Sequence, residues 1–145
     1  MSESHKAAIR DFFTAIDRSQ NMEAIDQLAA ATYTAHFPGA PPMNREAIKG
    51  YGNGFFAACP GLKHSVDALI AEGDCAAATL TIRGTHTRPF ATPMGAIPPS
   101  GKSFVMPVIN FYRFKDGLVI EHHSAFDMLS FLQQIGAMPG GQPGS

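Results

Sequence analysis

Apolar side chains recur at helical spacing through the first sixty residues. In the stretch 4–19 they stand three and four positions apart, which predicts an amphipathic helix. Asn21 and Asn44 can each cap a further helix, the first over 22–30 and the second over 45–59, because the asparagine side chain accepts a hydrogen bond from the first helical turn. The sequence therefore predicts three N-terminal helices.

A short extended segment, ATYTAHFPG at 31–39, separates the second and third of these helices. Side chains alternate across extended chain, so Tyr33, Ala35 and Phe37 share one side, and Thr34 and His36 share the other. A proline-rich loop follows.

From residue 62 the period changes from helical to alternating, which predicts four strands. Their bounds are 62–73, 74–90, 101–117 and 118–127. Gly73-Asp74 and Asp116-Gly117 have the turn chemistry of hairpins.

The segment ATPMGAIPPS at 91–100 is too rich in proline for a strand and predicts an ordered loop or lid. A final helix is expected over 128–136, and residues 138–145 are expected to form a flexible tail. Helices followed by a curved antiparallel sheet make a single α+β domain, here 1–137. Helices on the concave side would leave a conical cavity, the natural ligand site.

The last predicted strand carries the most chemistry. Its alternation places Glu121, His123, Ala125 and Asp127 on one face, and Leu118, Ile120, His122, Ser124 and Phe126 on the other. We expect the first face to point into the cavity, where acids need partners because burial of an unpaired charge is costly. That face would then be either a site or a satisfied structural network.

Asp127 has two interpretations. It directly precedes the final helix, where aspartate is a preferred N-cap that contributes about 1 kcal/mol. Alternatively it is a general acid/base, which needs an apolar pocket that raises its pKa toward the working pH.

Other polar residues could line the cavity beside Asp127. His123 shares its predicted face, and Asn110 lies in the apolar stretch PVINFYRF. His86 and Arg83 fall on opposite faces, so both cannot point inward; His86 is the preferred pocket residue, and Arg83 could pair with an acid.

His36, Tyr33 and Tyr51 complete the candidate substrate-binding residues. The first two precede the proline loop and could sit at the mouth of the cavity, and Tyr51 could donate to a substrate oxygen. The structural alternative is ordinary packing for all three, a surface position for His36, and for His123 a core histidine bonded to backbone.

Composition narrows the function. The net charge is −1 and no basic run occurs, which speaks against nucleic acid as a partner. No leader or long apolar run supports secretion or a membrane partner, and two widely spaced cysteines suggest buried thiols and a reducing, cytoplasmic location. Six histidines show no metal-ligand spacing, so we expect no metal.

Several stretches together resemble the SnoaL-like polyketide cyclases, which lie within the cone-shaped NTF2-like superfamily. They are GTHTRPF, PPSGK, INFYRFKDGLVIEHHSAFD, the trailing MLSFLQQIG and the upstream PPMNREAIKGY. The resemblance implies an NTF2-like cone with helices packed on a strongly curved antiparallel sheet. It also implies a homodimer through the convex sheet face, and it implies no cofactor. The chain departs from many relatives in carrying His123 where they carry tryptophan.

In that family the acid at the end of the last strand, here Asp127, acts as general acid/base of an intramolecular aldol ring closure. The implied function is therefore a cofactor-independent cyclase or isomerase of an apolar, polyketide-like small molecule.

Two alternatives stay open. One is epoxide-hydrolase-like water addition, using Arg83 with Asp67 or Asp127, although strand parity gives no support for their convergence. The other is a non-catalytic binding domain for an apolar molecule or a partner chain.

Overall fold

A curved five-stranded sheet forms the frame of the molecule. The structure is a computed structural model that describes residues 2–92 and 95–137. The strand order is β1-β7-β6-β3-β2. The strands are β1 Ala29–His36, β2 Lys63–Glu72, β3 Cys75–Thr85, β6 Ser103–Lys115 and β7 Leu118–Phe126. Strand β1 runs parallel to β7, and the other neighbours are antiparallel.

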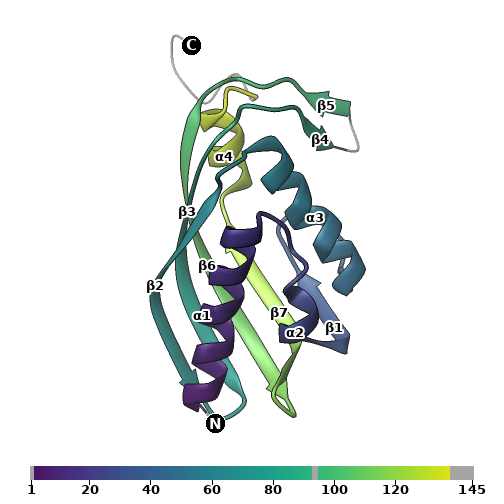
Figure 1. Ribbon diagram of the computed structural model, residues 1–145, viewed down its shortest axis with the longest axis vertical. Helices are drawn as coiled ribbons and strands as arrows, with labels where there is room; N and C mark the ends of the chain where they lie inside the picture. The colour runs from purple at the N-terminus through teal and green to yellow at the C-terminus, as the bar shows by residue number, and fades with distance from the viewer. Residues whose placement is uncertain (1, 93–94, 138–145) are drawn as a thin grey trace.

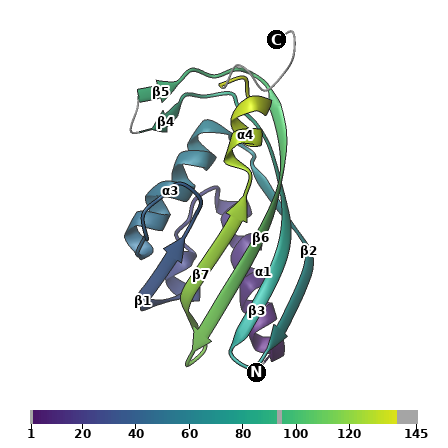
Figure 2. The same cartoon turned by 180° about the vertical axis from the view of Figure 1, so that it is seen from behind.

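Three helices cover one face of this sheet. They are α1 Ser2–Ser19, α2 Ile25–Leu28 and α3 Arg45–Ala58. Figure 1 shows them in front of the sheet, and Figure 2 shows the opposite face, which these helices leave open. The last helix, α4 Met128–Gln134, follows β7 directly and lies beside the far end of the sheet. The predicted α+β architecture with N-terminal helices on a curved sheet is confirmed.

Strict alternation along β6 defines the inner and outer faces of the sheet. The inner side chains are all buried: Phe104, Met106, Val108, Asn110, Tyr112 and Phe114. Outer residues such as Val105 and Ile109 are exposed. The core therefore lies between the inner face and the three helices.

The N-terminal region differs from prediction in the length of the second helix. Asn21 closes a turn by accepting a hydrogen bond from the backbone N–H of Glu23, and α2 spans only Ile25–Leu28. Ala29 already pairs with Val119 of β7. Strand pairing thus overrides the helix propensity of the alanines at 29–31. The cap of α3 is as predicted, since Asn44 accepts from Ala47 N at 2.8 Å.

The proline-rich segment is more ordered than a loop. It forms a small hairpin of β4 Phe90–Thr92 and β5 Gly95–Ile97, which Figures 1 and 2 show above the end of α3. The predicted tail at 138–145 lies outside the described residues. Among the helices in the described ranges, none is both long and apolar enough to cross a bilayer.

Candidate active site

An apolar cavity of about 100 Å³ lies between the inner face of the sheet and the helices. Most of its lining is aromatic or aliphatic, with aromatic side chains from both layers. They include Phe12, Phe13, Tyr51, Phe55, Tyr112 and Phe126. Typical ligand pockets span roughly 300–1,000 Å³. The cavity is therefore small for a ligand pocket and favours a small ligand.

Strand β7 presents the face opposite to the one we expected. His122, Ser124 and Phe126 line the cavity, whereas His123, Ala125 and Asp127 are exposed. We predicted that the face of β7 with Glu121 and His123 points inward, and this was wrong. Glu121 finds its partners, Arg113 and His123, on the outer face.

His122 is one of the buried polar side chains of the cavity. Its Nδ1 lies 2.8 Å from the hydroxyl of Tyr33, and its ring stacks on Tyr112 with centroids 4.6 Å apart. Burial lowers the pKa of His122 to about 3, with a smaller contribution from the nearby His123 and His36. The imidazole is therefore neutral at physiological pH.

The position of the proton on His122 follows from its partner. If the hydroxyl of Tyr33 donates to Nδ1, only the Nε2–H of His122 lacks a partner within the described residues. The other tautomer would leave two groups unmatched, the hydroxyl proton and Nε2. Because unmatched buried polar groups are costly, the first arrangement is favoured. His122 thus presents a hydrogen-bond donor to the cavity.

Of the other residues that line the cavity, two carry a buried polar atom without a hydrogen-bond partner in the described part of the chain. These atoms are the Oδ1 of Asn110 and the hydroxyl of Tyr51. The amide of Asn110 is held in place because its Nδ2 donates to the hydroxyl of Tyr112 at 2.9 Å. Burial raises the pKa of Tyr51 to about 12, so it stays protonated. We call His122, Asn110 and Tyr51 the polar cluster.

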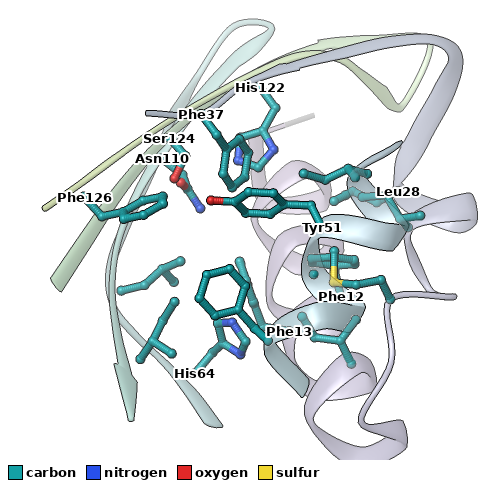
Figure 3. Close-up of a pocket in the computed structure, with 18 of the residues that line it drawn as sticks. Phe12, Phe13, Leu28, Phe37, Tyr51, His64, Asn110, His122, Ser124 and Phe126 are labelled. Atoms are coloured by element: carbon teal, nitrogen blue, oxygen red, sulfur yellow. The ribbon is translucent and has the colours of Figure 1, made fainter. Parts of the chain in front are cut away.

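Figure 3 shows how the polar cluster is built from two layers. His122 and Asn110 project from the sheet, and Tyr51 reaches from α3 with its hydroxyl toward Asn110 and Ser124. The cluster offers a donor at His122, an acceptor at Asn110, and a hydroxyl at Tyr51 that can do both. It therefore suits a ligand with a carbonyl and a hydroxyl group.

Asp127 and His123 lie outside this arrangement. Asp127 caps α4, since its Oδ1 accepts from Ser130 N at 3.0 Å, and it is exposed. The capping interpretation is confirmed. His123 is also exposed and stacks on His36 on the outside of the sheet, with centroids 4.6 Å apart. Neither Asp127 nor His123 is among the described residues that line the cavity.

The remaining predicted residues divide between the cavity and other places. Tyr33, Tyr51 and Asn110 line the cavity, as we expected. His86 is fully buried in the connection after β3, with its Nδ1 3.4 Å from the Oγ of Ser100, and does not reach the lining among the described residues. The expectation that His86 is a pocket residue therefore fails.

Arg83 is exposed on the outer face of the sheet, in a surface groove with Lys63 and Thr85. It points away from the cavity because its strand neighbours Ile82 and Gly84 alternate with it. Asp67 is also exposed and accepts a hydrogen bond from Thr81. None of Arg83, Asp67 and Asp127 is among the described residues that line the cavity, where water addition would need them.

The sequence analysis missed His122, Ser124 and His64 as cavity residues. For His122 and Ser124 a signal existed, because they share a strand face with the apolar Phe126. His64 lies on the same side of the extended chain as the apolar Leu62 and Val66, which also marks an inward face. Within 2–92 and 95–137, no three histidine, cysteine or acidic residues gather as metal ligands would.

The fold and the cavity define a cone-shaped α+β protein with an apolar small-molecule site. The sequence matches the family model of the SnoaL-like polyketide cyclases over residues 7–135. That match spans most of the chain, so the protein belongs to this family. A comparison with curated proteins found no significant match.

Solved structures share the whole architecture. AclR from Streptomyces galilaeus, a proposed hydroxylase, has a TM-score of 0.80 and 23% identity, and the alignment covers 96% of this chain and 100% of AclR. TsrD from Streptomyces laurentii has a TM-score of 0.79 and 24% identity, over 94% and 97% of the two chains.

IdmH from Streptomyces antibioticus, a proposed polyketide cyclase, has a TM-score of 0.75 and 28% identity, over 91% and 98%. Two different reactions are thus proposed for proteins that share this fold, and a fold alone does not fix a reaction.

Proposed function

We propose that the cavity binds an apolar, ring-containing, polyketide-like molecule and promotes acid/base chemistry next to one of its carbonyl groups. The reaction class is enolisation followed by intramolecular aldol closure or isomerisation. Membership of the SnoaL-like polyketide cyclases and the likeness to IdmH, a proposed polyketide cyclase, support the reaction class. The proposal needs no cofactor.

One observation carries the proposal: three buried polar atoms face a largely apolar cavity without a partner in the described chain. An unmatched buried polar group costs about 1–3 kcal/mol. Such a cost is tolerated where a ligand supplies the missing hydrogen bonds. The polar cluster is therefore better explained by binding than by packing.

The polar cluster suits the enolate of a carbonyl compound. The Nε2–H of His122 and the hydroxyl of Tyr51 can donate to the oxygen on which negative charge develops. Neutral donors in a water-poor site stabilise such an oxygen strongly, because little solvent competes. The Oδ1 of Asn110 can accept from a substrate hydroxyl, which would fix the orientation of the ligand.

A bicyclic carbon acid provides the direct test. 2-Tetralone has exchangeable hydrogens next to its carbonyl, and 2-naphthol is a flat analogue of its enol. We expect saturable binding of 2-naphthol, followed by fluorescence, and faster deuterium uptake by 2-tetralone in D₂O, followed by NMR. A protein that binds 2-naphthol without accelerating exchange would be a binding domain, and a protein that does neither would contradict the proposal.

Tyr51→Phe tests the polar cluster without changing its volume. We expect exchange to slow about 10-fold, equivalent to roughly 1.4 kcal/mol, while the free energy of unfolding rises by about 1 kcal/mol. The rise follows because an unmatched buried hydroxyl is removed. Unchanged exchange together with a lower melting temperature would mean that Tyr51 serves packing alone.

Asp127→Asn tests the role implied by the family resemblance. Asparagine caps a helix about as well as aspartate, so we expect an unchanged melting temperature. Because the carboxyl group is exposed and engaged by Ser130, we also expect unchanged exchange. Loss of exchange at an unchanged melting temperature would show that Asp127 takes part in proton transfer.

A further inference from the structure

We propose that His64, held by Asp17, is the general base that removes the proton from the substrate. This inference rests on the proposed function and names the proton acceptor that the polar cluster lacks. His64 lies in β2 and Asp17 lies in α1, so the pair joins the sheet to the first helix. Neither residue was a candidate in the sequence analysis.

Two hydrogen bonds fix the pair. One carboxylate oxygen of Asp17 lies 2.7 Å from the Nδ1 of His64, and the other accepts from the backbone N–H of His64 at 2.7 Å. An ionised carboxylate only accepts hydrogen bonds, so Nδ1 must carry the ring proton. In the neutral ring the lone pair then resides on Nε2. His64 is thus a hydrogen-bond acceptor, the opposite of His122.

The ring of His64 is positioned at the cavity. It lines the cavity between two aromatic side chains, with centroid distances of 5.1 Å to Phe13 and 6.1 Å to Phe56. Within the described residues, Nε2 has no protein partner for a hydrogen bond. Figure 3 shows His64 at the opposite end of the cavity from Asn110 and Tyr51. A ligand between them would have a base on one side and donors on the other.

His64 also borders solvent. The same side chain lines an outer groove between α1 and β2, together with Asp17, Arg10 and Lys63. The side chain of His64 keeps 10% of its surface exposed and that of Asp17 keeps 19%. This position allows the ring to exchange its proton with water while its cavity side stays apolar.

The proposed step is the transfer of a proton from carbon to His64. The C–H bond next to the carbonyl breaks, and its proton forms an N–H bond with Nε2 of His64. The released electron pair forms a C=C bond, and the carbonyl π electrons move to oxygen, which gives the enolate. Asp17 stabilises the imidazolium, and the polar cluster stabilises the enolate. In ring closure the enolate carbon attacks a second carbonyl carbon of the same molecule; a C–C bond forms, the C=O π bond breaks, and the imidazolium gives its proton to the resulting alkoxide. In the exchange assay the imidazolium exchanges its proton with D₂O and returns a deuteron to carbon.

The alternative is that Asp17 and His64 only tie α1 to β2. Gln20 already contributes to such a tie, since it bonds both the carbonyl of Leu62 and the N–H of Gly61. A purely structural pair would affect melting but not proton transfer. The test therefore needs a readout of the ring proton itself.

Two variants separate these roles. His64→Gln keeps a donor for Asp17 but removes the base, and we expect deuterium exchange to fall at least about 100-fold. Asp17→Asn can still accept from the backbone N–H, but its amide donates to Nδ1 and moves the ring proton to Nε2. We expect a similar loss in kcat with KM unchanged, and ¹⁵N NMR should report the switch of tautomer.

Asp67→Asn is the matched control for Asp17→Asn. Asp67 lies on the same strand as His64, β2, and it also accepts a side-chain hydrogen bond, from Thr81. This substitution should leave exchange unchanged. If wild-type protein accelerates exchange and His64→Gln does so equally, the inference is overturned and the proposed function stands. If wild-type protein shows no exchange, both are overturned. Should His64→Gln not fold, the exchange rate and NMR signature of Asp17→Asn decide the question.

Discussion

His122 and His123 are neighbours in the chain with opposite environments. The first is buried against Tyr33 and Tyr112, and the second is exposed beside Glu121. The difference arises because successive side chains of a strand point to opposite faces. Burial disfavours the protonated form of His122, because the charged ring loses its solvation.

That cost makes stability depend on pH. The pKa of His122 is about 3 in the folded protein, against an ordinary value of 6.5. Below pH 6.5 the unfolded chain therefore binds a proton that the folded chain does not, so stability falls as pH falls from 6.5 toward about 3.

We expect about 2 kcal/mol of this loss between pH 7 and pH 5. In His122→Gln this part of the loss should vanish, and urea denaturation at the two pH values measures it. Equal losses in the wild type and the variant would show that His122 is not the group responsible.

Some site residues could be predicted from sequence and others could not. Asn110 and Tyr33 were found because each stands in a clearly alternating apolar stretch. His64 was missed because its role depends on Asp17, 47 positions away, and no local pattern reports such a distance. Asp127 had two interpretations from the sequence, because an acid between a strand and a helix can be either a helix cap or a catalytic group.

At the scale of elements, α3 carries three glycines with different surroundings. Gly50 is exposed and has open space where a Cβ would lie. At Gly52 a Cβ would stand 2.4 Å from the Cγ of Met22, which lines the cavity. Gly52 therefore permits a close approach, whereas Gly50 only weakens the helix.

We expect Gly50→Ala to raise the free energy of unfolding by about 0.5–1 kcal/mol, through helix propensity. Gly52→Ala has the same propensity gain but overpacks Met22, which costs about 1–3 kcal/mol. It should be neutral to destabilising in urea denaturation. Equal stabilisation by both substitutions would show that Met22 moves away without cost.

The helices and strands were largely predictable from the sequence. Which face of a strand points into the cavity was not always predictable. Alternation identified all four long strands, and Asn44 marked the start of α3 correctly. For β7 the same alternation left two faces to choose from. The choice failed because Glu121 finds Arg113 across the outer face, a cross-strand partner that appears only once the strands are in register.

At the scale of the whole molecule, the outer face of the sheet carries exposed apolar side chains on its central strand, among charged residues on other strands. Ile109 is 60% exposed and Val105 is 48% exposed on the central strand β6. Ile109 is flanked by Thr79 and Ala125 in the neighbouring strands. Exposed apolar groups in one area often mark an interface, and the family resemblance implies a homodimer here.

We expect Ile109→Glu to shift the protein toward monomer in sedimentation velocity, because a buried unpaired charge at an interface is costly. Leu118→Glu, at the tip of the β6–β7 hairpin, is the control and should leave the mass unchanged. A wild-type protein that sediments as a monomer would contradict the predicted dimer.

The parallel pairing of β1 with β7 has a consequence for synthesis on the ribosome. Tyr33 of β1 and His122 of β7 are 89 residues apart in the chain. During synthesis, the edge strand β1 therefore cannot pair until β7 has emerged. Contacts between distant parts of a chain form slowly. The nascent chain therefore exposes an unfinished apolar core until β7 has left the ribosome, because β1 pairs with β7.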